Sequence, residues 1–178
     1  MKKKILAISG SVRKASINTA ILRHIKESYQ EDLDIEIYDK VDQLPIFNPD
    51  LTDELLPTII QSLQTKIANA DGVLISTPEY VFSLPGNLKN LLEWNVATTV
   101  FAQKPTAFII AAASGQKAFA SLDLVMSTIT CAPIPNELKL LLQGIGKKVD
   151  TNGQLNEVAA IEKIATLMAA FNVILQKG

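Results

Sequence analysis

The stretch Gly10-Ser11-Val12-Arg13-Lys14-Ala15-Ser16-Ile17-Asn18-Thr19 decides the fold, because it joins a buried strand to a helix through a polar turn. Apolar residues 5–8 lead into it, and the apolar positions at 17, 20, 21, 22 and 25 repeat with helical spacing. Hydroxyl groups and unpaired N–H groups at a helix N-terminus bind a phosphate dianion well, and the helix dipole adds to the attraction. The pattern therefore indicates a phosphate site, unless Ser11 and Ser16 only form the turn and cap the helix.

Strands and helices alternate along the rest of the chain. We expect strands at 3–9, 35–38, 73–76, 106–112 and within 134–140, and helices at 16–29, 53–69, 85–94, 118–130 and 155–175. Such alternation gives a parallel sheet covered by helices on both faces. The sequence thus predicts a single α/β domain over residues 1–178, a flavodoxin-like three-layer doubly wound sheet of five parallel strands in the order 2-1-3-4-5.

Sheets of this kind bind ligands beyond the carboxyl ends of their strands, where the strand order reverses. Three loops are predicted at that edge, and we call residues 10–19, 77–83 and 114–117 the first, second and third crevice loops. Each is polar or contains glycine, as a binding site requires. Asn152-Gly153, at the opposite edge, is predicted to be an ordinary turn.

Charge and composition exclude several classes of protein. The 178 residues carry a formal net charge of −1, which argues against a nucleic-acid partner and against a strongly acidic electron carrier. The single cysteine, Cys131, excludes a disulfide framework and a cysteine-rich metal site, and we expect it to be a buried thiol. The apolar stretches at 5–8 and 107–113 are too short for a signal peptide or a membrane span. We therefore expect a soluble, cytoplasmic protein without a metal or a membrane partner.

The missing motifs narrow the choice of ligand. A dinucleotide turn needs G-x-G-x-x-G, whereas Gly10 is the only glycine of this turn, and the Walker motif is absent. A response-regulator domain needs an aspartate after the third strand, where Ser76-Thr77 stand. Hydroxyl groups, an asparagine and one arginine suit a single phosphomonoester instead. Flavin mononucleotide (FMN) is the common cofactor of that description in this fold.

Two motifs on the crevice loops resemble those of the NADPH-dependent FMN reductase family. They are Gly10-Ser11-x-Arg13-x-x-Ser16-x-Asn18 and Pro78-Glu79-Tyr80-x-x-Ser83-x-Pro85-Gly86-x-Leu88-Lys89-Asn90-x-x-Glu93-Trp94. That family includes flavin and quinone reductases, azoreductases and chromate reductases of flavodoxin-like fold. The resemblance covers most of the first hundred residues closely and the remainder by element order alone.

The resemblance implies where FMN binds. Its phosphate would be held by Ser11, Arg13, Ser16, Asn18 and Thr19. Its ring and ribityl chain would lie along Pro78, Glu79, Tyr80, Val81 and Phe82, largely through backbone groups. Ser114 and Gly115 would approach the pyrimidine edge of the ring.

The sequence departs from the family pattern in three places. Val81 stands where asparagine is usual, and Glu93 stands where aspartate is usual. In the third crevice loop, Gln116-Lys117-Ala118-Phe119 and later Leu122-Asp123 replace paired glycines and a leucine-arginine pair. Bulk at this loop would narrow the access of nicotinamide or acceptor.

The resemblance also implies the chemistry and the assembly. NADPH or NADH would give hydride to the flavin, which would pass two electrons to a quinone, azo, flavin or metal-oxyanion acceptor by a ping-pong mechanism. Relatives pair through helices near the flavin, so we expect a homodimer or homotetramer, with Trp94 and Phe101 either in the core or at that contact. Two alternatives stay open: a flavodoxin-type electron carrier, and a regulatory module that has lost turnover.

Overall fold

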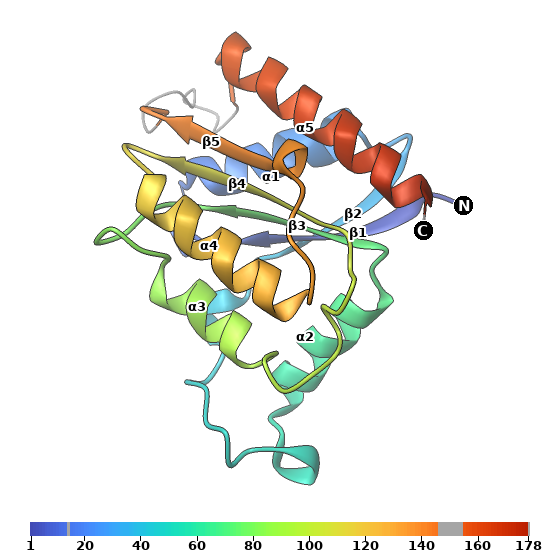
Figure 1. The fold of residues 1–178 in the computed structure, drawn as a ribbon, viewed down its shortest axis with the longest axis vertical. Coiled ribbons are helices and arrows are strands. Elements are labelled where there is room, and N and C mark those ends of the chain that lie inside the picture. The colour runs from blue at the N-terminus through green and yellow to red at the C-terminus, as the bar shows by residue number, and fades with distance from the viewer. Residues whose placement is uncertain (14, 146–154, 178) are drawn as a thin grey trace.

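The fold is a five-stranded parallel sheet between two layers of helices (Figure 1), in a computed structural model that describes residues 1–13, 15–145 and 155–177. The strands are β1 (Lys3–Ser9), β2 (Leu33–Tyr38), β3 (Gly72–Thr77), β4 (Thr106–Ala112) and β5 (Lys139–Gln143). They lie in the order β2-β1-β3-β4-β5, and every neighbouring pair is parallel. The predicted fold class and strand order are confirmed.

Helices cover both faces of the sheet. They are α1 (Ile17–Ser28), α2 (Thr58–Asn69), α3 (Gly86–Glu93), α4 (Gln116–Ile129) and α5 (Val158–Lys177). Figure 1 shows α1 and α5 on one face and α2, α3 and α4 on the other. Every residue of β3 and β4 is therefore buried, which is why these strands are continuous apolar runs rather than alternating ones.

The fifth strand begins later than the sequence suggests. Residues 134–138 are not strand: a short 3₁₀ turn at Asn136–Leu138 precedes β5. Pro133 and Pro135 lack the N–H group that a sheet ladder needs, so pairing with β4 begins only after them.

Helix boundaries also differ from the expected ones. The segment expected to be helical from residue 53 is a 3₁₀ turn at Asp53–Leu55, and α2 begins only after its N-cap residue Pro57. The residue before a proline, here Leu56, disfavours the helical conformation, so the helix cannot easily begin earlier. Helix α4 begins at Gln116 and α5 at Val158, whereas Asn152-Gly153 lie outside the described residues. The expectation of a buried thiol is wrong: Cys131 is exposed, with a φ of +58° after the end of α4.

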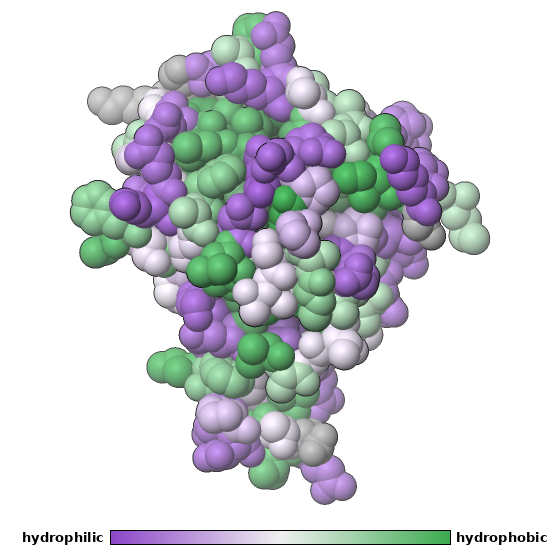
Figure 2. Space-filling view, viewed as in Figure 1, coloured by the Kyte–Doolittle hydropathy of each residue, from purple (hydrophilic) through white to green (hydrophobic). Residues whose placement is uncertain are grey.

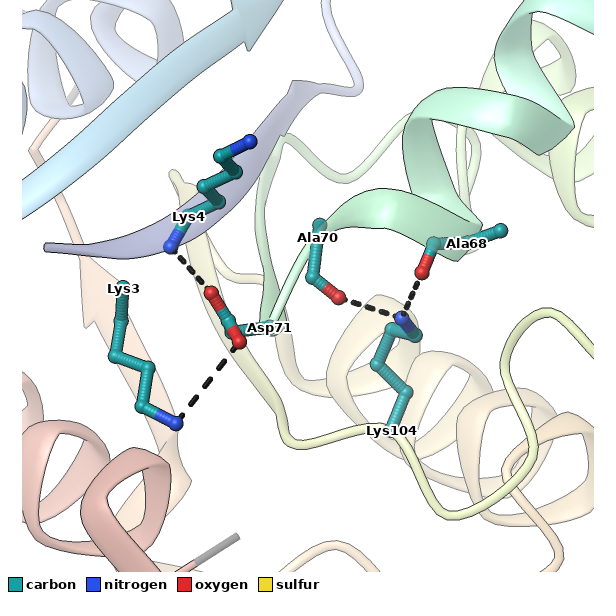
Figure 3. Close-up of polar contacts among 6 residues, drawn as sticks. All are labelled: Lys3, Lys4, Ala68, Ala70, Asp71 and Lys104. Atoms are coloured by element: carbon teal, nitrogen blue, oxygen red, sulfur yellow. Dashed lines mark hydrogen bonds and ion pairs between the residues drawn. The ribbon is translucent and has the colours of Figure 1, made fainter. Parts of the chain in front are cut away.

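One ion pair and three hydrogen bonds between side chains and backbone groups join three segments at the amino-terminal edge of the sheet (Figure 3). The Lys104 ammonium donates to the carbonyl oxygens of Ala68 at 3.1 Å and Ala70 at 2.6 Å, at the end of α2. The Asp71 carboxylate accepts from the Lys4 N–H at 2.7 Å and lies 3.9 Å from the Lys3 ammonium. Burial lowers the pKa of Lys104, an effect that nearby Asp71 opposes. These contacts hold the edge that lies away from the predicted crevice.

Helix α5 is apolar enough to raise the question of a membrane. Among the described residues it is the one helix with the length and mean hydropathy, 1.8, of a membrane span. The core helix of a soluble protein has the same properties, however, and one side of α5 lies in the hydrophobic core. The buried residues are Ala160, Ile164, Leu167, Met168, Phe171 and Leu175. We therefore assign α5 to packing against the sheet.

Candidate functional site: the crevice at the carboxyl edge of the sheet

A cavity of about 260 Å³ lies between the first and second crevice loops and the end of β4. Seven of the predicted site residues line it: Ser11, Arg13, Ser16, Asn18, Pro78, Glu79 and Tyr80. Thr19, Val81, Phe82, Ser114 and Gly115 lie outside this lining. Two cavities elsewhere are larger, at about 480 and 540 Å³, but they do not contain the predicted residues. The crevice is therefore the candidate site because of the residues that line it, not because of its volume.

Gly10 lets the first crevice loop pass close to β3. Its N–H donates to the Ser76 carbonyl at 2.8 Å. A Cβ atom at this position would lie 2.2 Å from the Thr77 hydroxyl oxygen and 3.0 Å from Leu88 in α3. Glycine is thus required here by a steric limit, not by an unusual φ angle.

The N-terminus of α1 is open to an anion. Ser16 is the N-cap residue, yet its hydroxyl makes no capping bond, and the first turn carries no acidic side chain. The alternative that Ser16 serves only as a cap is therefore not supported. Helix N-termini leave backbone N–H groups without intrahelical partners, and Ser11, Arg13 and Ser16 line the cavity beside them. The donor set suits a phosphate monoester.

The Asn18 side chain connects the elements that lie beneath the crevice. The residue is 1% exposed, its Oδ1 accepts from the Ser76 hydroxyl at 3.0 Å, and its Nδ2 donates to the Ala111 carbonyl at 3.2 Å. The side chain thus ties α1 to the ends of β3 and β4. Thr19 is similarly engaged, because its hydroxyl lies 2.9 Å from that of Ser9. Both side chains are used within the protein, which leaves chiefly their backbone N–H groups for a ligand.

The second crevice loop ends in a tight turn with an unusual sequence. Tyr80 and Ser83 exchange two backbone hydrogen bonds of 3.0 Å, and Val81 and Phe82 between them have φ angles of +49° and +56°. Two positive φ angles are typical of a type I′ turn, which normally contains asparagine and glycine, so a β-branched valine is strained here. Val81 is 93% and Phe82 77% exposed. The loop between β3 and α3 projects at the left in Figure 1, and Figure 2 shows apolar colouring on that side of the molecule.

Glu79 connects the second crevice loop to α4. Its carboxylate accepts from the backbone N–H groups of Ala118 at 2.9 Å, Lys117 at 2.9 Å and Gly115 at 3.1 Å. These donors, with that of Ala118 first, hold the pKa of Glu79 below its ordinary value. Glu79 lines the cavity, but its carboxylate binds the protein's own backbone.

The residues at 116–119, which depart from the family pattern at the third crevice loop, belong to a helix. Residues 116–119 form the first turn of α4, and Gly115 is its N-cap with a φ of +88°. Phe119 packs edge-on against Phe108 of β4, with ring centroids 5.2 Å apart, so its bulk is directed toward the core. Ser114 is exposed beside this turn.

Sequence reasoning missed three buried polar residues under the crevice. Ser9, Ser76 and Thr77 are at most 2% exposed, and all three lie at the carboxyl ends of strands, directly after buried apolar residues. The sequence signal that could have identified these residues is a serine or threonine directly after an apolar strand. Among the described residues, no group of three or more His, Cys, Asp and Glu side chains could hold a metal ion.

The sheet order and the open helix N-terminus define a flavodoxin-like protein with a crevice for a phosphorylated ligand. The sequence matches the NADPH-dependent FMN reductase family over residues 3–140. The chain therefore belongs to the NADPH-dependent FMN reductase family.

Individual relatives agree with this assignment. The chain is 38% identical to an NADPH:quinone oxidoreductase of Arabidopsis thaliana over 111 residues, covering 60% of this chain and 56% of that protein. It is 32% identical to a quinone reductase of Escherichia coli K12 over 94 residues, covering 52% and 50%. The chain thus matches about half the length of these two relatives. An NAD(P)H-dependent FMN reductase of Pseudomonas aeruginosa is 28% identical, with 96% of this chain and 94% of that protein covered.

A solved structure shows the same fold. The flavoenzyme NAD(P)H:(acceptor) oxidoreductase FerB of Paracoccus denitrificans superposes with a TM-score of 0.79, covering 98% of each chain at 21% sequence identity. At this identity the likeness supports the architecture alone.

Proposed function

We propose that the chain is an FMN-dependent oxidoreductase that takes electrons from NADPH or NADH and delivers them to a small-molecule acceptor. The observation that carries the proposal is the N-terminus of α1, where Ser16 does not cap its helix and the first turn holds no acid. Ser11 and Arg13 line the same cavity, so hydroxyl, guanidinium and backbone donors are available to one ligand there. This set fits the single phosphate of FMN.

Each part of the crevice has a proposed role in holding the cofactor. Ser11, Arg13, Ser16 and the N–H groups of the first α1 turn would bind the phosphate, with Asn18 and Thr19 contributing through the backbone. Pro78, Tyr80, Val81 and Phe82 would line the ring and ribityl chain, while Ser114 and Gly115 would lie toward the pyrimidine edge. The polar cluster around Asn18 keeps the α1 N-terminus in place before any ligand binds, which lowers the entropic cost of binding.

Bound FMN would supply the hydride and electron transfer, and the chain's residues would supply position and access. The described crevice contains no cluster of acidic, histidine and cysteine side chains of the kind that holds a catalytic metal. Nicotinamide and acceptor would occupy the same exposed side of the crevice in turn, which predicts ping-pong kinetics. Exposed Val81 and Phe82 offer an apolar surface beside that space.

We infer the acceptor class from the relatives, several of which are named quinone reductases. A planar quinone is the first acceptor to test, with azo compounds, free flavins and metal oxyanions after it. We further propose a soluble, cytoplasmic homodimer or homotetramer. Trp94 and Phe101 are 3% and 1% exposed, so their side chains belong to the core, and an assembly contact would use other residues.

The central experiment follows the visible spectrum of the purified chain after incubation with FMN. We expect retained yellow flavin that is bleached by NADPH or NADH under anaerobic conditions and recovers when a quinone is added. Bound flavin that is not bleached would refute the reductase and favour an electron carrier. A chain that binds no FMN would favour a regulatory module.

A paired variant tests the phosphate site. Arg13→Ala with Ser16→Ala removes two proposed contacts, and charge-assisted bonds of this kind predict a rise in the FMN Kd of about 100-fold. The matched control is Arg23→Ala with Ser28→Ala, which removes the same residue types from exposed positions farther along α1. Equal affinity of the two double variants would show that the phosphate lies elsewhere.

A further inference from the structure

We propose that Glu79 is a positioning residue that sets the distance between the second and third crevice loops and closes the N-terminus of α4 to ligand anions. The inference rests on the proposed function, because it concerns how the same crevice receives FMN. It replaces the direct cofactor contact that the sequence motif suggests for this residue.

The bonding of the carboxylate carries the first step. Oε2 accepts from the N–H groups of Lys117 and Ala118, both at 2.9 Å, and Oε1 accepts from that of Gly115 at 3.1 Å. A carboxylate at a helix N-terminus is further stabilised by the helix dipole. Both oxygens are thus used by backbone donors, and the side chain is directed at α4.

Both ends of this bridge are held in place. On one side, the turn that begins at Tyr80 is closed by two backbone hydrogen bonds with Ser83. On the other side, Gly115 has a φ of +88°, and a Cβ atom there would lie 2.7 Å from Leu141 and 2.9 Å from Ile110. Because neither end can shift easily, the Glu79 bridge fixes the relative position of the two loops.

The N-termini of α1 and α4 follow the ends of β1 and β4 at this edge of the sheet, and they differ in the groups that occupy them. Helix α1 has no acid in its first turn and no side-chain cap, so it can receive an anion. Helix α4 lacks an acid in its own first turn, but Glu79 supplies one from 39 positions away in the sequence. Of these two helix N-termini, that of α4 is occupied by the Glu79 carboxylate, and that of α1 is left for the single phosphate of the proposed ligand.

Loss of the bridge should loosen the third crevice loop before any cofactor is present. In FMN-free protein, we expect Glu79→Ala to speed amide exchange at Lys117 and Ala118 about tenfold or more, since each donor loses its acceptor. The matched control is Glu36→Gln, which removes a surface carboxylate paired with Lys66 and should leave these amides unchanged.

Cofactor binding supplies the second readout. We expect the FMN Kd to rise about tenfold in Glu79→Ala and about threefold in Glu79→Gln, because glutamine keeps one acceptor oxygen. At saturating FMN, the visible spectrum of Glu79→Ala should also differ from that of the wild type, since the surroundings of the ring have changed. Normal exchange at these amides, or an unchanged Kd and spectrum in folded Glu79→Ala, would overturn the positioning role. Absence of FMN binding by the wild-type chain would instead overturn the proposed function.

Discussion

Replacement of Asn18 by alanine separates a structural role from a ligand-binding role. The substitution removes the hydrogen bond from the Ser76 hydroxyl, at 3.0 Å, and the bond to the Ala111 carbonyl, at 3.2 Å. Ser76 is 0% exposed, so its hydroxyl would lose its hydrogen-bond partner in a buried position. Two lost bonds and one buried unpaired group together predict a loss of about 2–4 kcal/mol in the free energy of unfolding.

Urea unfolding of the FMN-free chain measures this loss. With an m-value of about 2 kcal/mol per M for a chain of this size, the midpoint should fall by about 1–2 M. Asn69→Ala, at an exposed position of α2, is the matched control and should change the midpoint little. A double-mutant cycle with Ser76→Ala should give a coupling energy of about 1 kcal/mol between the two side chains.

A structural role of the Asn18 side chain is refuted if Asn18→Ala leaves the stability of the FMN-free chain within about 0.5 kcal/mol of the wild type. Such a result, together with a large rise in the FMN Kd, would mean that the side chain binds the cofactor directly, as the sequence motif suggests. The two roles thus predict opposite outcomes before FMN is added.

Three other variants test separate features. Because the pKa of Glu79 is lowered in the folded chain, its carboxylate stabilises the fold at a pH above 4.5, the ordinary pKa of glutamate, and this stabilisation is lost as the pH falls through the folded pKa. Glu79→Gln should therefore make the free energy of unfolding fall less steeply with decreasing pH, measured by unfolding between about pH 3 and about pH 6. Gly10→Ala should lower the melting temperature and weaken FMN binding, because its methyl group would overlap the Thr77 hydroxyl; a variant as stable as the wild type would show that the loop is less constrained. Combined Val81→Asn and Phe82→Gly should raise the free energy of unfolding by about 1 kcal/mol by relieving strain, and an unchanged or lower value would contradict a type I′ turn at this position.

Local sequence signals predicted the elements that lie in the middle of the fold. The bounds of β1 and β4 match the prediction, because long apolar runs bordered by polar residues mark buried parallel strands. The short β5 was misplaced, since Leu138 and the leucines at 140–142 are apolar alike and only pairing with β4 decides which of them are strand. Cys131 is exposed in a left-handed conformation after α4, a position that glycine usually marks and that is therefore hard to recognise when a cysteine stands there.

The roles of individual site residues were less accessible from the sequence. Motif spacing located the first and second crevice loops, and seven of the predicted residues line one cavity. The partners of Asn18 and Glu79, however, lie 58 and 39 positions away, at Ser76 and Ala118. A side chain that hydrogen-bonds to a distant part of the chain cannot be told from a ligand-binding side chain by residue type alone. The folded structure is needed to distinguish the two roles.

The contacts at the amino-terminal edge have a consequence for how this protein can diversify. Lys104 and Asp71 join α2, β1 and the start of β4 at the end of the sheet opposite the binding loops (Figure 3). Strands β1, β3 and β4 are thereby anchored at one end, and each is followed by a crevice loop at the other end. Crevice-loop positions that make no contact with the rest of the fold can therefore be changed without touching these anchors, whereas Gly10, Asn18 and Glu79 have to be kept.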